Sequence, residues 1–251
     1  MRRLRVLTLG SIVILFVACG ASTPDGSQSL PTSRSTFALR AADPAPGAVG
    51  SGHVVVEAEG GSFRVSKTPS SLGVVRRYRA VNPWGQPLWL PRIAARIVSG
   101  DEWIKVLLPD RPNGATGWVR ADDVIAGTVQ DRIVVRLGRH TLARYHAGQV
   151  VERFPVAVGK PSTPTTPGRF FVWARVGYQD VTGPYGNFAL GLSGFSRVIT
   201  DWPGGGRMAI HGTSSPNIAG LDVSNGCVRV SNPLMAKLID VAMGAIVVIR
   251  R

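Results

Sequence analysis

The chain has 251 residues, of which 44% are hydrophobic and 18% charged, so it has enough apolar material for one large or two small domains and is not a wholly disordered chain. Its formal net charge is +14, and most of its 29 basic residues are arginines. These arginines are spread singly, and no nucleic-acid-binding motif is present. We therefore expect no nucleic-acid partner, and an anionic cell wall or membrane surface instead.

Residues 1–19 are predicted to be a signal peptide. A positively charged start precedes an apolar run at residues 6–18, which is shorter than the roughly 20 residues of a membrane-spanning helix. Residues 16–19 resemble a bacterial lipobox, which implies that Cys19 is a lipid anchor. An ordinary signal peptide or an uncleaved anchor is the alternative. We expect an exported protein of the cell envelope, lipid-anchored on the outer side of the cytoplasmic membrane.

Residues 20–52 are predicted to be a flexible linker. They are dominated by Ser, Pro, Gly, Ala and Thr and show no apolar period. Such a tether would let a lipid-held domain reach into the wall.

Residues 53–127 are predicted to form a small β domain. Short apolar runs, separated by turn-forming clusters, predict strands at residues 54–56, 88–90, 94–98, 103–108 and 117–119. The sequence DEWIKVLL at residues 101–108, followed by GWV at 117–119, resembles a bacterial SH3-like domain. This resemblance implies a small β-barrel, and we expect its tryptophans to lie in the core rather than to serve as carbohydrate platforms.

Residues 128–251 are predicted to be a second β-rich domain. Strands are expected at residues 133–135, 142–145, 150–158 and 245–249, with a hairpin turn at 138–140. The one clear helix has Asn232 as its N-cap and Pro233 at its first position, continues to Ala242, and is closed by Gly244. The predicted fold class is therefore mainly β with few short helices.

Cys227 is the candidate nucleophile. If Cys19 is lipidated or removed, Cys227 stands alone in an oxidising compartment, where an unpaired thiol is a liability unless it is buried or used. A disulfide between the two cysteines is the alternative. A thiol nucleophile needs a base, and His211 has a pKa suited to that role. By themselves, a lone cysteine and a histidine sixteen residues away favour the alternative, a small buried thiol and an unrelated imidazole.

The sequence around these two residues resembles a known family. Residues 207–213 read RMAIHGT and residues 224–230 read SNGCVRV, which is similar to the histidine and S-H-G-C-hydrophobic-R motifs of L,D-transpeptidases of the YkuD type. The segment VGKPSTPTTPGRF at residues 158–170 and the segments at 183–186 and 189–194 resemble further parts of this family. The resemblance covers about residues 130–251, and it implies a β-sandwich-like catalytic domain.

The resemblance also implies roles for individual residues. Cys227 would be the nucleophile and His211 its base, oriented by the backbone carbonyl of Gly212. Backbone N–H groups around Gly226 and Cys227 would form the oxyanion hole. The substrate-binding residues would be Gly226, Ser224, Asn225 and Arg229. Asn225 replaces the family's usual histidine and cannot be protonated near neutral pH, which puts any acid role of that position in doubt.

The resemblance implies a peptidoglycan L,D-transpeptidase acting on stem peptides. It also implies that no cofactor and no metal is required, because the thioester conserves the energy of the broken peptide bond. The alternatives are an L,D-carboxypeptidase, an enzyme that anchors proteins to the wall, and a non-catalytic wall-binding protein. The other histidines, His53, His140 and His146, are expected in exposed loops.

Overall fold

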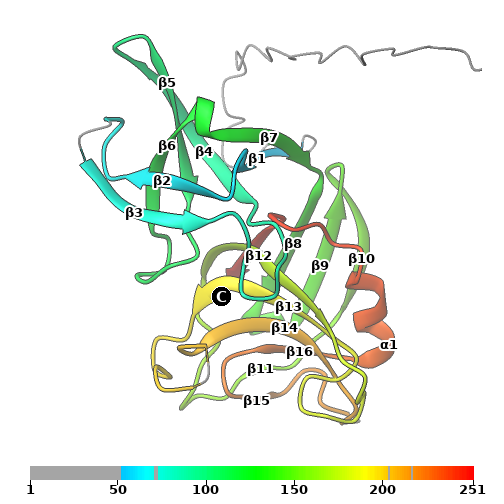
Figure 1. The fold of residues 1–251 in the computed structure, drawn as a ribbon. Coiled ribbons are helices and arrows are strands. Elements are labelled where there is room, and N and C mark those ends of the chain that lie inside the picture. The colour runs from blue at the N-terminus through cyan, green and yellow to red at the C-terminus, as the bar shows by residue number, and fades with distance from the viewer. Residues whose placement is uncertain (1–51, 71–72, 203, 216) are drawn as a thin grey trace, which may run out of the picture. The chain divides into compact units, whose positions relative to one another are not determined.

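The computed structural model describes residues 52–70, 73–202, 204–215 and 217–251. The predicted signal peptide, its Cys19 and nearly all of the predicted linker lie outside these residues. The described residues belong to one compact unit by their contacts. Strands dominate the described part of the chain, which confirms the prediction of a mainly β protein (Figure 1). Within that part, no helix is long and apolar enough to cross a membrane.

The first sheet is built from residues 53–129. Its strands are β1 (His53–Ala58), β2 (Ser62–Ser66), β3 (Val74–Arg79), β4 (Leu90–Val98), β5 (Asp101–Leu107), β6 (Thr116–Arg120) and β7 (Val124–Val129). They are hydrogen-bonded in the order β3-β2-β6-β5-β4-β1-β7. Trp103 and Trp118 are buried, as expected for core tryptophans. The SH3-like character of this region and its domain boundaries stay predictions.

Some strands of this sheet differ from the sequence prediction. The two predicted strands at 88–90 and 94–98 form one strand, β4, which begins only at Leu90. Leu88 and Trp89 precede it, because the Leu88 N–H donates to the carbonyl of Ala80 in the preceding loop. Strands β2 and β3 were not predicted, since their exposed faces carry arginines that interrupt the apolar pattern.

The second sheet is built from residues 131–250. Its strands are β8 (Asp131–Arg136), β9 (Thr141–His146), β10 (Gln149–Pro155), β12 (Gly168–Gly177), β13 (Phe188–Phe195), β14 (Arg207–Thr213), β16 (Val228–Ser231) and β17 (Ile246–Arg250). Their order is β10-β9-β8-β17-β12-β13-β14-β16, and β11 (Val158–Gly159) pairs separately with β15 (Asp222–Ser224). The predicted strand at 150–158 is therefore divided between β10 and β11.

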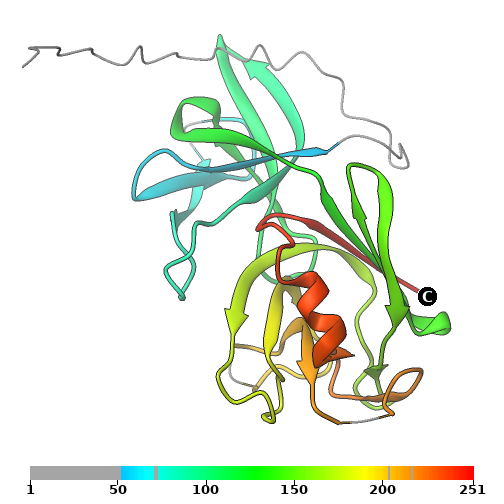
Figure 2. The same ribbon diagram turned by 90° about the vertical axis from the view of Figure 1, so that its right-hand side faces the viewer.

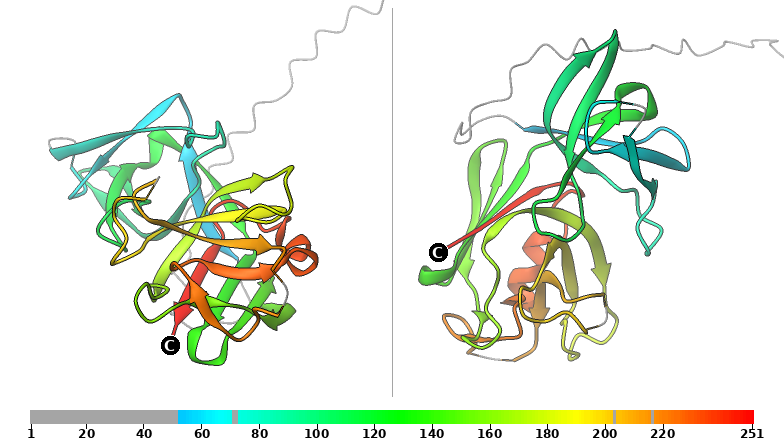
Figure 3. Two further views of the ribbon diagram at one scale, coloured as in Figure 1. Left: turned by 90° about the horizontal axis from the view of Figure 1, so that it is seen from below. Right: turned by 90° about the vertical axis from the view of Figure 1, so that its left-hand side faces the viewer.

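This sheet curves around one apolar core (Figures 2 and 3). The core joins side chains from β8, β9, β12, β13, β14, β16 and β17 to the helical segment after β16. Ile210 and Val228 pair across β14 and β16 and both point into this core. Because side chains alternate along a strand, their neighbours on these two strands point to the opposite, outer face.

The helix is shorter than predicted. Helix α1 (Asn232–Met235) is followed by a 3₁₀ turn at Ala236–Leu238, and Ser231, not Asn232, is the N-cap residue. The side chain of Asn232 instead bonds to another loop, accepting from the N–H of Asn187 and donating to the carbonyl of Val181. Tertiary hydrogen bonds have thus replaced the capping role that the sequence favoured for Asn232.

Candidate active site

His211 and Cys227 come together on the outer face of the second sheet. Strands β14 and β16 are parallel, with Ile210 opposite Val228 and His211 opposite Arg229. Cys227 directly precedes β16, so it lies beside Ala209 and points to the same face as His211. The imidazole and the thiol are therefore neighbours on two adjoining strands.

The His211 imidazole is buried and held in one orientation. Its side chain is 2% exposed. Nδ1 lies 2.7 Å from the carbonyl oxygen of Gly212, and since a carbonyl can only accept, Nδ1 carries the proton and Nε2 is free to accept one. Burial lowers the pKa of His211 to about 4, opposed by the Gly212 hydrogen bond and assisted by the positive charge of Arg229. The imidazole is consequently neutral at physiological pH.

The Cys227 thiol is also neutral in the free protein. Cys227 is a half-buried free cysteine. Burial raises its pKa, while the Ala209 backbone and the charge of Arg229 act in the opposite direction. An un-ionised thiol and an unprotonated imidazole therefore lie on neighbouring strands, an arrangement in which a thiol proton can pass to an imidazole.

The turn before Cys227 is fixed by Ser224. The buried Ser224 hydroxyl donates to the carbonyl of Cys227 at 2.5 Å and accepts from the N–H of Gly226 at 3.1 Å. Gly226 has a φ of +109°, which disfavours any residue with a side chain. Asn225 is exposed. The Gly226 N–H already donates to Ser224, so Gly226 offers no free donor to an oxyanion in this conformation.

Arg229 places a positive charge near both reacting groups. It is half-buried on β16, directly opposite His211. Its Nε is buried without a hydrogen-bond partner among the described residues. The guanidinium is thus suited to an anionic ligand beside Cys227.

One wall of the site is an aromatic loop between β12 and β13. Tyr185 packs edge-on against the His211 ring, with centroids 5.1 Å apart, and Tyr178 stacks on Tyr185 at 5.5 Å. Asn232 holds this loop against β14, because its Oδ1 accepts from the N–H of Asn187. A Cβ on Gly212 would lie 2.4 Å from that Oδ1, so the close approach requires glycine.

Comparison with known proteins shows what this part of the chain is similar to. Residues 130–249 match the model of the YkuD L,D-transpeptidase catalytic domain. The YkuD protein of Bacillus licheniformis is 35% identical over 105 residues, which cover 42% of this chain and 56% of that protein. The YkuD protein of Bacillus subtilis is 32% identical over 114 residues, which cover 45% of this chain and 62% of that protein. The chain thus spans little more than half the length of these curated relatives.

Residues 130–249 are thus similar in sequence to the catalytic domains of YkuD-type L,D-transpeptidases.

Two solved structures resemble this chain. A variant of the Enterococcus faecium L,D-transpeptidase is 25% identical, with a TM-score of 0.38 and coverage of 48% of this chain and 49% of that chain. L,D-transpeptidase 3 from Mycobacterium tuberculosis is 14% identical, with a TM-score of 0.41 and coverage of 65% of this chain and 91% of that chain.

The L,D-transpeptidase domain gathers all seven candidate site residues that the sequence indicated. Six lie on β14, on β16 or in the turn before β16, and the seventh ends β15. These residues are His211, Gly212, Ser224, Asn225, Gly226, Cys227 and Arg229. Their individual roles stay predictions. The sequence did not indicate Tyr178, Tyr185, Asn187 or Asn232 as site residues. Tyr185 lies within the family-like segment at 183–186, which is the signal that could have indicated it.

The other histidines lie away from this domain's reacting face. His53 was expected in an exposed loop, but it lies in β1, half-buried, with Nε2 2.9 Å from the carbonyl of Gly244. His140, in a turn as expected, is half-buried and pairs with Asp222, and His146 lies near Asp131. Within the described residues, no group of His, Cys, Asp and Glu side chains is arranged to hold a metal ion.

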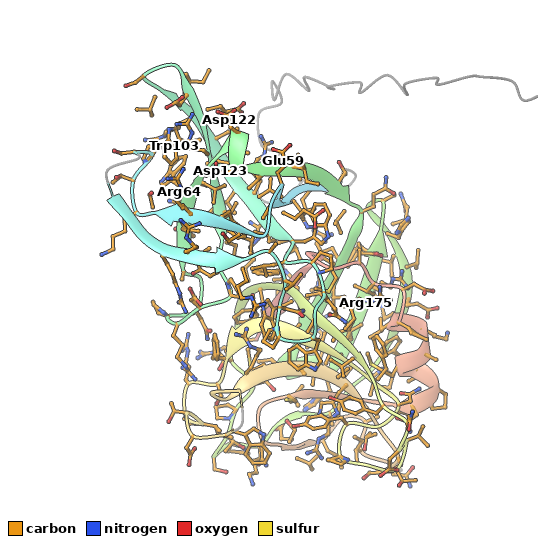
Figure 4. The ribbon with its side chains drawn as sticks, in the orientation of Figure 1. Glu59, Arg64, Trp103, Asp122, Asp123 and Arg175 are labelled. Carbon is orange, nitrogen blue, oxygen red and sulfur yellow. The ribbon has the colours of Figure 1, made fainter. Side chains whose placement is uncertain are left out.

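A separate hollow of about 400 Å³ lies on the first sheet. Figure 4 labels four of the residues that line it, Glu59, Arg64, Asp122 and Asp123. Charged side chains of both signs line it, and several pair with one another or with nearby residues. Arg64 faces Asp123 at 3.9 Å, Arg120 binds Asp122 at 3.0 Å, and Arg77 donates to Ser62. This hollow is not part of the L,D-transpeptidase site.

Proposed function

We propose that this protein is a peptidoglycan L,D-transpeptidase in which Cys227 is the nucleophile and His211 the base. The observation that carries the proposal is the tautomer of His211. With Nδ1 committed to the Gly212 carbonyl, the Nε2 lone pair is available on the face that also holds the Cys227 thiol. This arrangement occurs within a catalytic domain of the L,D-transpeptidase family.

The reaction has two acyl-transfer steps. In the first, the thiol gives its proton to His211, and the sulfur attacks the carbonyl carbon of the third residue of a tetrapeptide stem. The tetrahedral intermediate collapses as His211 returns the proton to the leaving amine, so D-alanine departs and a thioester remains. In the second, the side-chain amine of a neighbouring stem loses a proton to His211 and attacks the thioester, which forms the cross-link and regenerates the thiol.

Three neighbours assist these steps in the proposal. Because the Gly226 N–H donates to Ser224, the N–H of Cys227 is the nearer candidate donor for the oxyanion. Arg229, with its buried and unpartnered Nε, would hold a carboxylate of the stem. The exposed Asn225 would contribute no proton transfer, so the single imidazole of His211 would serve as both acid and base.

The same proposal includes export and anchoring. The charged start, apolar run and lipobox-like residues 16–19 support a lipid anchor at Cys19 in the cell envelope. Residues 20–52 would be a tether, and residues 53–127 an SH3-like domain between the tether and the catalytic domain.

Product analysis tests the proposal. The purified chain lacking residues 1–19 is incubated with a disaccharide-tetrapeptide, and the products are separated and weighed. Release of D-alanine with a cross-linked dimer is expected from the wild type and not from Cys227→Ala. Release of D-alanine without a dimer would indicate a carboxypeptidase instead. No turnover by a folded wild-type protein would leave the non-catalytic wall-binding alternative.

A further inference from the structure

The segment between β13 and β14 forms a second wall beside the nucleophile. Here this wall segment means residues 195–202 and 204–206. Its Ser196 is buried, and a Cβ on Gly226 would lie 4.0 Å from Ser196 Oγ. Ser196 Oγ in turn accepts from the N–H groups of Val198 and Ile199, at 3.2 and 3.0 Å. The wall segment therefore borders the turn that carries Cys227.

The wall segment has internal hydrogen bonds, such as Ser196 N–H to the Gly206 carbonyl at 2.8 Å, but its end is rich in glycine. Gly204, Gly205 and Gly206 all have positive φ, of 84°, 69° and 71°. Consecutive glycines lose much conformational entropy on ordering, so the segment needs stabilising contacts from elsewhere. Val198 is 53% exposed and Trp202 is 49% exposed, and neither contributes much to a core.

The first sheet provides further hydrogen bonds to the wall segment. In the turn between β5 and β6, the Asn113 amide pairs with both backbone groups of Phe195, donating to its carbonyl at 2.8 Å and accepting from its N–H at 2.8 Å. Arg111 Nη2 donates to the carbonyls of Gly205, at 2.8 Å, and Ile199, at 3.3 Å. Its guanidinium also lies 4.7 Å from the centre of the Phe195 ring.

The same turn has a reciprocal contact from β14. The Arg207 guanidinium lies between the rings of Trp173 and Phe195, at 3.8 and 4.3 Å, and donates to the carbonyl of Pro109 at 3.1 Å. Burial lowers the pKa of Arg207 to about 10, so it remains charged at neutral pH. The β5–β6 turn is thus bonded both to the wall segment and to the strand that carries His211.

We propose that Arg111 and Asn113 are positioning residues of the active site. By fixing the wall segment, they set the position of Ser196 against the Gly226 turn and hold Val198 and Trp202 as an exposed apolar rim for the bound stem peptide. The first sheet would then be part of the substrate-binding apparatus and not only a connector to the wall. This inference rests on the proposed function, because it assigns substrate binding to the same site.

Steady-state kinetics of the full mature chain test the proposal. Arg111→Ala and Asn113→Ala are compared with Arg77→Ala, whose side chain is exposed and bonds only to Ser62 in its own sheet. We expect the KM for a disaccharide-tetrapeptide to rise about tenfold in the first two variants, with kcat within about twofold of wild type, because displaced binding groups weaken substrate positioning. Arg111→Lys should recover part of the loss.

A merely structural role would lower the melting temperature of Arg111→Ala and Asn113→Ala and leave KM at the value of the Arg77→Ala control, and this result would overturn the proposal.

Hydrogen exchange provides a test that does not depend on turnover. In Arg111→Ala we expect amide protection to fall in the wall segment and also at residues 224–227, with Arg77→Ala unchanged. Unchanged protection at 224–227 would overturn the inference even if the wild type is active. If the wild type has no activity but protection falls as expected, the coupling stands and the proposed function fails.

Discussion

The outer face of the catalytic sheet is divided into two regions that use similar side chains differently. Arg207 and His211 both lie on β14 and point to this face. Around Arg207, aromatic rings and the β5–β6 turn cover the strand and satisfy its polar groups. Around His211, Tyr185 packs against the ring, and the neighbouring Arg229 Nε has no hydrogen-bond partner in the described part of the chain.

The part of β14 that binds the first sheet is therefore separate from the part that holds the candidate site residues. In the region around Arg207, called here the covered region, aromatic faces and carbonyl groups stabilise the buried charge. This side chain therefore helps to hold the two sheets together. In the region around His211 and Arg229, called here the reacting region, burial keeps the imidazole neutral. It also leaves the Arg229 guanidinium without a full set of partners among the described residues, which costs stability and is typical of functional sites. Substitutions in the two regions should therefore have separable effects.

The largest expected effect comes from removing the base. In His211→Gln we expect the rate of Cys227 acylation by a carbapenem to fall by about 10³-fold, because no group remains to accept the thiol proton. Stopped-flow fluorescence measures this rate. The control His140→Gln removes a surface pair with Asp222 and should leave the rate unchanged. Equal rates for His211→Gln and wild type would rule out His211 as the base.

The buried imidazole also predicts how stability depends on pH. The pKa of His211 is about 4 in the folded protein, against an ordinary value of 6.5. Between these values the unfolded chain binds a proton that the folded chain does not. The free energy of unfolding should therefore fall as the pH drops from 6.5 to 4, by roughly 3 kcal/mol from this group. Urea titrations of wild type and His211→Gln measure it, and parallel curves for the two would contradict the assignment.

Gly212→Ala should damage the reacting region through packing. The new Cβ would lie 2.4 Å from Asn232 Oδ1 and 2.7 Å from Asn187 Oδ1. Displacing these groups should release the aromatic loop and lower the acylation rate by about 10²-fold. Gly138→Ala is the matched control, because its Cβ would meet no atom within 4 Å. An acylation rate for Gly212→Ala equal to that of the control would show that the aromatic loop does not need this close approach.

The smallest effect on activity is expected in the covered region. Gln86 accepts from the N–H of Arg175 at 3.0 Å and donates to its carbonyl, joining the first sheet to β12 (Figure 4 shows Arg175). The Gln86 side chain also accepts from Asn82 Nδ2 at 3.2 Å. Gln86→Ala should lower the free energy of unfolding by about 3 kcal/mol, for three lost hydrogen bonds, and leave acylation within twofold. Chemical denaturation checks the first value. A large loss of acylation would mean that the two regions are not separable at this point.

The two regions also differ in how well the sequence predicts them. His211 and Cys227 lie in short motifs whose neighbours in the sequence are their neighbours in the fold, so the reacting region was predicted from the motifs alone. The covered region joins residues far apart in the chain, such as Asn113 with Phe195 and Gln86 with Arg175. Single amide side chains that replace strand pairing leave no periodic pattern in a sequence.

The same limitation explains the local differences. In the second sheet the apolar pattern predicted β8, β9, β10 and β17 but not the central strands β12 and β13. In the first sheet it did not predict β2 and β3, whose exposed positions carry arginine. Asparagine is favoured at N-caps, but the side chain of Asn232 accepts a hydrogen bond from a loop that the local sequence does not predict to be near. Tertiary hydrogen bonds, not propensity, decided these positions.

The most direct test of the central claim is to locate the acyl group. The mature chain is mixed with a disaccharide-tetrapeptide and quenched in acid, and the intact protein and its proteolytic peptides are weighed. The account predicts an adduct with the mass of the donor less D-alanine, attached to the peptide that contains Cys227 and absent from Cys227→Ala. An adduct on another residue, or turnover that survives in Cys227→Ala, would contradict it.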